Sequence, residues 1–374
     1  MLHIQDPNYS NSYSLHEALI KSCSSANGGK GAYAFVSRTG AELFLADVEF
    51  EKMLERGIYN LIVGIDEITN TSTIERLSDF QDIYQSLEIR AFLHNSNNSL
   101  FHPKLSYFTK SDGGGDLVIG SGNLTAGGLR KNREAFAIIN LSQDELLKIE
   151  AYWNEWLVQS DSYLKPLNDV DVLERVGANS ARARARQDYP ISPTQQIYAD
   201  EAIGSDDQGT DESQEWSFQE SNLVLLAEIP RSGDRWNQAN FDINTFENFF
   251  GATAGDNSQR ILLRSIISNR VLGNIEVRPS VSVVSQNYRF ELEAAAGLEY
   301  PQIGRPIGVF VRLSTRMFIY KLFMPEMDEK YLDIADWMNA NWTGRTDRMK
   351  RIVKPVGEIR GLLQNSPVYS FFMV

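Results

Sequence analysis

The first part of the chain alternates short apolar runs with longer stretches whose apolar residues recur every three to four positions. Two such longer stretches cover residues 47–57 and 71–87. Short apolar runs are typical of buried strands, and the longer spacing is typical of amphipathic helices. The runs that predict strands are residues 32–36, 60–66, 88–94, 104–108, 117–120 and 134–140. The alternation predicts a mixed α/β sheet with helices on both faces.

A further helix is predicted over residues 142–160, where this region ends. Ser142 is suited to the N-cap because a serine side chain accepts a hydrogen bond from the first helical turn. Leucine, isoleucine and tryptophan follow at helical spacing. We interpret the aromatic residues of this helix as core or interface positions rather than as a surface that stacks bases.

The second part of the chain has a different pattern. Its apolar runs are short, rich in β-branched and aromatic residues, and interrupted by Gly, Pro and Asn. These runs are residues 221–230, 260–268, 280–285, 288–295, 307–313 and 317–324. Many short strands with frequent breaks are typical of a small barrel or pseudobarrel, so we expect mainly β structure here.

The tail after Met327 ends in an amphipathic, basic stretch over residues 343–363. A helix that packs on the β region with its charges in solvent, contact with DNA, and a docking surface for a partner all remain open for it. Its cations include Arg345, Arg348, Lys350, Arg351 and Lys354.

Charge separates the two parts. The net charge is −13, of which residues 221–374 contribute +2 and residues 1–220 contribute −15. Residues 200–220 hold eight acidic residues and no basic one, and this run has no core-forming pattern. We therefore predict an α/β domain at 1–165, a helical and acidic linker at 166–220, and a β domain with a helical tail at 221–374. Before the acidic run, three arginines alternate with alanines: Arg182, Arg184 and Arg186. They form either the solvated face of a helix or linker, or a contact with a phosphate backbone.

Composition narrows the classes of protein. Cys23 is the only cysteine, which excludes an intrachain disulfide and a cysteine-rich zinc site. Only four histidines are present (His3, His16, His94 and His102), so a centre with several histidine ligands is not expected. No apolar run reaches the length of a membrane span, and the first residues lack a basic region followed by an apolar one. We expect a cytoplasmic protein that does not enter a membrane.

Candidate chemistry is concentrated between residues 101 and 134. Side chains two apart on a strand share a face, so His102 and Lys104 are expected to point into one site. An imidazole is a nucleophile or acid–base group near neutral pH, and a lysine and an asparagine donate to phosphoryl oxygens. The residues that complete the pattern are Gly120, Ser121, Asn123 and Glu134. Together they indicate a phosphodiester as substrate.

This pattern resembles the HKD motif of the phospholipase D superfamily, in which HxK precedes GSxN and a later glutamate. His102, Lys104, Ser121, Asn123 and Glu134 match it. The family's aspartate would fall at Thr109, so the resemblance is to members that lack it. Glu134 is then the candidate that orients the imidazole, and Asp116, in a glycine-rich turn, is the poorer choice.

The chain contains one such motif, whereas a phospholipase D site uses two. The resemblance therefore implies a homodimer through the N-terminal domain, in which His102 of one copy attacks phosphorus and His102 of the other protonates the leaving oxygen. It implies no metal and no other cofactor for cleavage.

Two polar segments of the β domain have the composition of a DNA-reading surface. Arginine suits guanine and phosphate, and asparagine and glutamine suit adenine. A solvated turn remains the alternative for the first segment. The first segment holds Arg231, Arg235, Trp236, Asn237 and Gln238, and the second holds Gln286, Asn287, Tyr288 and Arg289.

Taken together, the chain resembles phospholipase D-type restriction endonucleases whose DNA-recognition domain is a pseudobarrel of the plant B3 type. The resemblance implies a type II-like enzyme that cuts double-stranded DNA, with a cognate methyltransferase. Some members depend on a helicase-like ATPase, so ATP would enter only through such a partner. The alternatives are another phosphodiesterase, acting on lipid or RNA, and a DNA-binding module without catalysis.

Overall fold

The computed structural model describes residues 1–66, 68–94, 100–188, 215–231, 236–253, 256, 259–279 and 288–373, with side chains except those of 183–188, 279 and 288. The chain forms two compact units. The first comprises Met1–Asp6 and Tyr13–Glu212, and the second comprises Pro7–Ser12 and Ser213–Val374.

The first unit is built on an eight-stranded sheet with the order β1-β7-β6-β5-β2-β3-β4-β8. Strands β2, β3 and β4 are parallel to one another, whereas β5, β6, β7 and β1 pair antiparallel. This is the predicted mixed sheet. The strands are β1 (Leu2–Gln5), β2 (Ala26–Tyr33), β3 (Tyr59–Gly64), β4 (Leu87–Phe92), β5 (Lys104–Lys110), β6 (Gly115–Gly120), β7 (Glu134–Leu141) and β8 (Leu164–Pro166).

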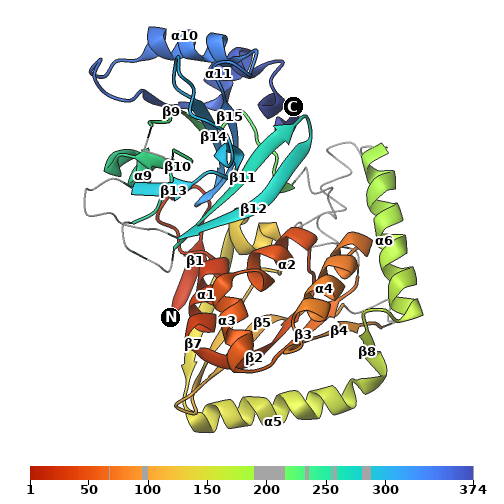
Figure 1. Cartoon of the computed structure of the whole chain (residues 1–374). Coiled ribbons are helices and arrows are strands. Elements are labelled where there is room, and N and C mark those ends of the chain that lie inside the picture. The colour runs from red at the N-terminus through yellow and green to blue at the C-terminus, as the bar shows by residue number, and fades with distance from the viewer. Residues whose placement is uncertain are drawn as a thin grey trace. The chain divides into compact units, whose positions relative to one another are not determined.

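Helices cover both faces of this sheet, and Figure 1 shows α1 to α4 grouped together and α5 apart from them. Tyr107 of β5 packs with Trp153 of α5, whereas its neighbour Phe108 points the other way and stacks on Tyr59, which contacts Phe50 of α3. The helices are α1 (Leu15–Ser24), α2 (Arg38–Leu45), α3 (Val48–Arg56), α4 (Thr71–Ile83), α5 (Gln143–Gln159) and α6 (Val170–Asp188), with short turns η1 (Gly127–Lys131) and η2 (Asp161–Tyr163).

Two helices of this unit begin with reciprocal caps. Ser142 accepts from the backbone N–H of Glu145 at the start of α5, and the Glu145 side chain accepts from Ser142 in return, so the predicted N-cap is confirmed. Ser14 and Glu17 make the same arrangement at the start of α1. Each pair satisfies N–H groups that have no partner within the helix.

The second unit consists mainly of strands. Six form a sheet with the order β12-β11-β15-β14-β9-β16, and β10 pairs with β13. The strands are β9 (Leu223–Glu228), β10 (Gln238–Phe241), β11 (Arg260–Ser268), β12 (Val271–Pro279), β13 (Tyr288–Glu291), β14 (Ile307–Ser314), β15 (Met317–Phe323) and β16 (Arg351–Pro355). The helical elements are α9 (Ile243–Asn248), η3 (Glu293–Ala295), α10 (Tyr331–Asn341), α11 (Val356–Leu363) and η4 (Pro367–Phe371). A plant B3-type pseudobarrel remains a prediction.

Aromatic side chains fill the core of the second unit. Phe250 contacts Phe241, Phe290 and Phe310 at ring-centroid distances of 4.8 to 5.5 Å. Such pairs add about 0.5–1.5 kcal/mol each beyond the apolar area that they bury. The segment Pro7–Ser12 belongs to this unit, because the Thr315 hydroxyl donates to the Tyr9 carbonyl over 2.9 Å.

Among the described residues, every helix is too short or too polar to cross a lipid bilayer.

Candidate active site

The ends of three adjacent strands bring the sequence candidates to one edge of the sheet. β5 and β7 both run antiparallel to β6, so the start of β5, the end of β6 and the start of β7 lie together. Lys104 opens β5, and Glu134 opens β7. His102 precedes β5, and Asn123 follows β6. Strand pairing therefore gathers residues that are up to 32 positions apart in the chain.

His102 and Lys104 lie against one another. The ammonium nitrogen of Lys104 is 3.1 Å from Nδ1 and 2.9 Å from Nε2 of His102. Only one carbon separates the two ring nitrogens, so an ammonium in the ring plane at these distances would collide with that carbon. Lys104 Nζ therefore lies over the ring face, where it can also donate to a bound phosphoryl oxygen.

The protonation of His102 is tuned by this arrangement. Partial burial, and then the charge of Lys104, lowers the pKa of His102 below its usual 6.5. Both causes disfavour the charged imidazolium. Phe35, two residues past the end of β2, meets the ring of His102 edge to face at a centroid distance of 5.9 Å. The neutral imidazole, which is the nucleophilic form, is favoured at neutral pH.

Ser121 and Glu134 form a second pair at the same edge. The Ser121 hydroxyl donates to one carboxylate oxygen of Glu134 and accepts from the Ala135 N–H at 3.1 Å. The Asn132 amide donates to the other oxygen at 3.4 Å. Glu134 is buried, so these donors stabilise its charge. Orientation of an imidazole by Glu134 remains a prediction.

Asn123 is held in a close-packed loop. Gly128 allows this packing, since a Cβ there would lie 2.4 Å from both the backbone N and O of Asn123. The next residue, Leu124, donates its N–H to the Phe35 carbonyl over 3.2 Å, which ties the loop to the ring that contacts His102. Asn123 is buried, and its Oδ1 accepts no hydrogen bond from the described residues. The packing of the loop thus fixes the position of Asn123.

The missing aspartate has a structural explanation. Thr109 lies five residues along β5 from Lys104, which is about 17 Å at the rise of a strand. It is therefore at the far end of the strand from the candidate site. Asp116 is at that end too, where it pairs with Lys110 and accepts from Asn140, each at 2.7 Å. Neither position can serve the site.

Sequence reasoning missed a polar cluster on the parallel strands of the same edge. Asp66 follows β3 and His94 follows β4, and the His94 Nε2 is 3.1 Å from an Asp66 oxygen. Arg175 of α6 donates to the other oxygen at 2.9 Å. Each residue is the last of a run that predicts a strand, and the carboxyl ends of parallel strands meet at one edge, so these positions could have been recognised from the sequence.

Four of the residues predicted to read DNA are not covered by the description. Arg235, Gln286 and Asn287 lie outside the described residues, and so does the side chain of Tyr288. The same holds for the side chains of Arg184 and Arg186 and for residues 200–214 of the acidic run. Trp236 is buried in the aromatic core, and its indole N–H donates to the Leu298 carbonyl over 2.7 Å. It supports the segment around it and has little surface left for a base.

The β10–β13 ribbon carries two of the other predicted residues, Gln238 and Arg289. Ala239 and Phe241 of β10 and Phe290 of β13 point into the core. Because strand side chains alternate, Gln238 and Arg289 lie on the opposite, solvent-facing side. The Gln238 amide donates to Glu291 over 3.1 Å. Asn237 is half-buried beside this ribbon, and Arg231 is exposed.

The basic tail is divided between β16 and α11, and most of its cations meet carboxylates of the same unit. Lys350 lies 3.1 Å from Glu228, Lys354 lies 2.8 Å from Glu358, Arg345 lies 2.8 Å from Asp347, and Arg351 pairs with Asp242. This supports packing on the β unit rather than a surface devoted to DNA.

Across the part of the chain that the structure describes, no group of three or more His, Cys, Asp or Glu side chains is placed to hold a metal ion.

No protein-family model and no curated protein matches the chain. Among solved structures it is similar to NucT from Helicobacter pylori, at 17% identity over 44% of this chain and 98% of that one, with a TM-score of 0.32. It is also similar to Nuc from Salmonella typhimurium, described as a phospholipase D family member, at 14% identity over 44% and 95%, with a TM-score of 0.32. It is similar as well to a yeast tyrosyl-DNA phosphodiesterase, at 8% identity over 44% of this chain and 41% of that one, with a TM-score of 0.30. Similarity this low carries no inference about activity, which has to come from the residues themselves.

Proposed function

We propose that the chain is a phosphodiesterase that cuts double-stranded DNA at a specific sequence. The observation that supports this best is the convergence of His102, Lys104, Ser121, Asn123 and Glu134 at one sheet edge. A nucleophilic imidazole, an ammonium and a buried amide are the groups that a phosphoryl transfer needs when protein side chains supply the electrostatic stabilisation.

The proposed reaction has two steps. One neutral His102 nitrogen attacks phosphorus, the bond from phosphorus to the leaving oxygen breaks, and that oxygen takes a proton from a second histidine ring in its imidazolium form, which becomes neutral. Water then attacks the phosphohistidine, gives a proton to the second imidazole, and releases His102 with its lone pair restored. Lys104 and Asn123 hold the non-bridging oxygens as charge develops on them.

The second imidazole is proposed to be His102 of another copy. The chain contains a single HxK and GSxN pair, so one copy supplies half of such a site. A two-fold axis through the site would place two equivalent rings on opposite sides of one phosphorus. A homodimer through the N-terminal unit is thus part of the proposed mechanism.

Recognition is assigned to the second unit. Gln238 and Arg289 on the outer side of the β10–β13 ribbon, with Arg231 and Asn237 nearby in sequence, have the donors and acceptors that read base edges and grip phosphates. The finer proposal is a type II-like restriction endonuclease with a cognate methyltransferase and no metal. Dependence on a helicase-like ATPase is part of the same proposal.

The experiment is cleavage of a duplex DNA library in EDTA by the wild-type chain and by His102→Ala. We expect the wild type to release discrete fragments and the variant to bind the same DNA without cutting it. The variant Arg289→Ala tests the ribbon, and Arg305→Ala, whose arginine pairs with Glu228, is its matched control. Loss of DNA binding in Arg289→Ala but not in Arg305→Ala would assign recognition to the ribbon.

Cleavage that survives in His102→Ala would contradict the proposal. Specific binding by the wild type without cleavage would favour a DNA-binding module, unless an added ATPase partner restored cutting. Hydrolysis of RNA or of a phospholipid, but not of DNA, would support the proposed phosphodiester hydrolysis and contradict DNA as the substrate.

A further inference from the structure

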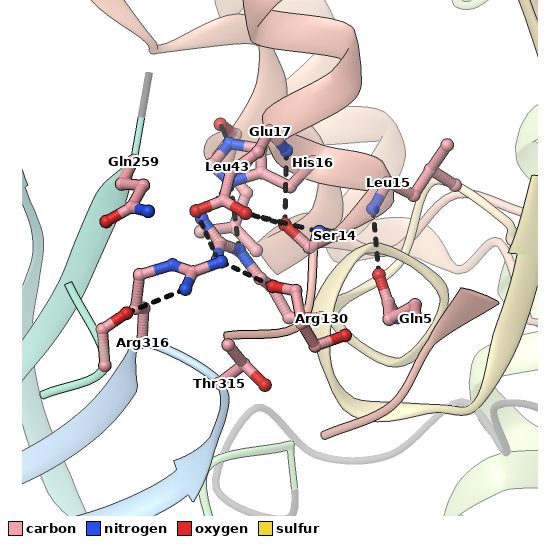
Figure 2. A network of polar contacts seen from close by, with 12 residues as sticks. Gln5, Ser14, Leu15, His16, Glu17, Leu43, Arg130, Gln259, Thr315 and Arg316 are labelled. Carbon is pink, nitrogen blue, oxygen red and sulfur yellow. Dashed lines mark hydrogen bonds and ion pairs between the residues drawn. The ribbon is translucent and has the colours of Figure 1, made fainter. Parts of the chain in front are cut away.

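A buried polar network lies behind the candidate site, and no residue in it belongs to the HxK or GSxN motif. Figure 2 shows its members on α1, on the strand β1 and on the loop after β6. Gln5, His16, Glu17 and Arg130 are all buried, each at 1% exposure or less. Buried polar groups are costly unless satisfied, and satisfied networks specify one arrangement of the segments that they join.

Gln5 connects three segments at once. Its amide nitrogen donates to the carbonyls of Gly128 and Asn132 over 3.2 and 2.9 Å. Its amide oxygen accepts from the Leu15 N–H at 2.9 Å. One side chain on β1 thus fastens both ends of the η1 turn to the first turn of α1. The backbone of Gln5 is also the register partner of Glu134.

Arg130 makes a second connection between η1 and α1. Its Nε and one terminal nitrogen lie 3.1 and 2.8 Å from Nδ1 of His16, and the other terminal nitrogen lies 3.4 Å from Glu17. The His16 Nε2 faces the Leu43 carbonyl at 2.7 Å. A carbonyl only accepts and a guanidinium only donates, so His16 is the neutral tautomer with its proton on Nε2. Its two partners set that tautomer unambiguously.

The network ends at the candidate catalytic groups. Asn132, whose carbonyl Gln5 holds, donates its side-chain amide to Glu134, and Glu134 accepts from Ser121. At the other end of η1, Gly128, whose carbonyl Gln5 also holds, packs against the backbone of Asn123. A shift of η1 would therefore move Asn123 and loosen Glu134 together.

We propose that Gln5 is a positioning residue for phosphodiester hydrolysis: it holds η1 to α1, and so keeps Asn123, Glu134 and Ser121 in their reactive geometry. The inference rests on the function proposed above. Gln5 touches none of the reacting atoms, and it acts through Asn132 and Gly128.

Asn179 provides a matched control in the same unit. It is equally buried, and its amide nitrogen likewise donates to two backbone carbonyls, those of Ile65 and Thr69, each at 2.9 Å. Gln5→Met and Asn179→Leu each remove one buried amide while nearly keeping side-chain volume. Both are expected to lower the melting temperature to a similar degree.

The two variants differ in their effect on the reaction. With a soluble aryl phosphodiester as the probe, Gln5→Met should lower kcat about 10- to 100-fold with little change in KM. Losses of this size are typical when a residue that orients a directly acting group is removed. Asn179→Leu should leave kcat close to the wild-type value, because the carbonyls that Asn179 holds are those of Ile65 and Thr69 and not those of η1. Hydrogen exchange of residues 120–135 should quicken in Gln5→Met and stay as in the wild type in Asn179→Leu.

Either of two results overturns the inference: unchanged exchange over residues 120–135 in Gln5→Met, or faster exchange there with an unchanged kcat. If Gln5→Met does not fold, Gln5→Asn, whose shorter amide cannot reach both carbonyls, is measured in the same way. Probe hydrolysis that persists in His102→Ala would instead overturn the proposed function, and the exchange comparison would still decide whether Gln5 holds η1.

Discussion

At the scale of single residues, the central feature is a lysine placed over an imidazole. Lys104 Nζ is close to both nitrogens of His102, and its charge is one of two causes that lower the pKa of that ring. The same cation that is proposed to bind the phosphoryl group thereby keeps the nucleophile neutral before substrate arrives.

Replacing Lys104 tests this coupling. In Lys104→Met the pKa of His102 should rise toward 6.5, because the nearby positive charge is gone while burial still lowers it. The imidazole is protonated below its pKa, so the wild type should stay neutral to a lower pH than the variant. NMR titration of the four histidine rings, assigned with His102→Ala, measures the two midpoints.

Lys110→Met is the matched control, because Lys110 lies at the other end of β5 beside Asp116. In Lys110→Met, the pH midpoint at which His102 titrates should equal that in the wild type. A midpoint in Lys104→Met at or below the wild-type value would show that the lysine does not act on the ring.

At the scale of elements, the end of β6 depends on close strand packing. A Cβ on Gly120 would lie 2.4 Å from the Ala135 carbonyl oxygen and 2.5 Å from the Phe136 Cβ. Gly120→Ala should force β6 and β7 apart where Ser121 meets Glu134. We expect a loss of about 1–3 kcal/mol of stability and a larger loss of activity than stability alone explains, measured by denaturant unfolding and by probe hydrolysis.

Gly177→Ala is the comparison for this substitution. Gly177 lies in α6 with nothing within 4 Å of a Cβ, so alanine there should stabilise by about 0.5–1 kcal/mol through helix propensity. Equal effects of the two alanines on stability and rate would contradict the packing argument.

Most elements of the first unit could be predicted, because five of the six apolar runs largely coincide with strands, whereas the run 32–36 shares only Ala32 and Tyr33 with β2. The start of β2 at Ala26 could not be predicted, since Asn27 to Lys30 show no apolar pattern. Helix α1 was missed although Ser14 and Glu17 form a capping box that sequence can reveal. Strand β16 lies in a stretch whose charges suggested a surface, and its partner β9 is distant in sequence.

The candidate site could also be predicted only in part, because some of its contacts join residues that are far apart in the sequence. Short motifs placed His102, Lys104 and Glu134 at strand starts, where backbone pairing then brought them together. The contacts of Gln5 and Arg130 span more than 100 residues. A single sequence carries no local pattern for such pairs.

At the scale of the whole molecule, hydrogen bonds from side chains to the backbone join distant parts of the chain in ways that local patterns do not mark. Residues Pro7–Ser12 belong to the second unit, although Met1–Asp6 before them and Tyr13 after them belong to the first. Arg316 donates to the Ser10 and Ser12 carbonyls at 3.0 and 2.6 Å. The short segment is therefore held by hydrogen bonds to its backbone, which any sequence could accept.

The proposed half-site makes a prediction that only an assembly can meet. If every active site needs His102 from two copies, a dimer of one wild-type and one His102→Ala copy is inactive. Wild type and variant refolded together in equal amounts should then show about a quarter of the activity of the same total amount of wild type, because random pairing makes one dimer in four fully wild type. Independent sites would give half. Mixing with Lys110→Met, which is altered at the far end of β5, should retain full activity in either case. A value of one half, with sedimentation showing a monomer, would mean that the second proton donor lies within one chain, and the His94–Asp66 pair at the same sheet edge would then be the residue pair to substitute next.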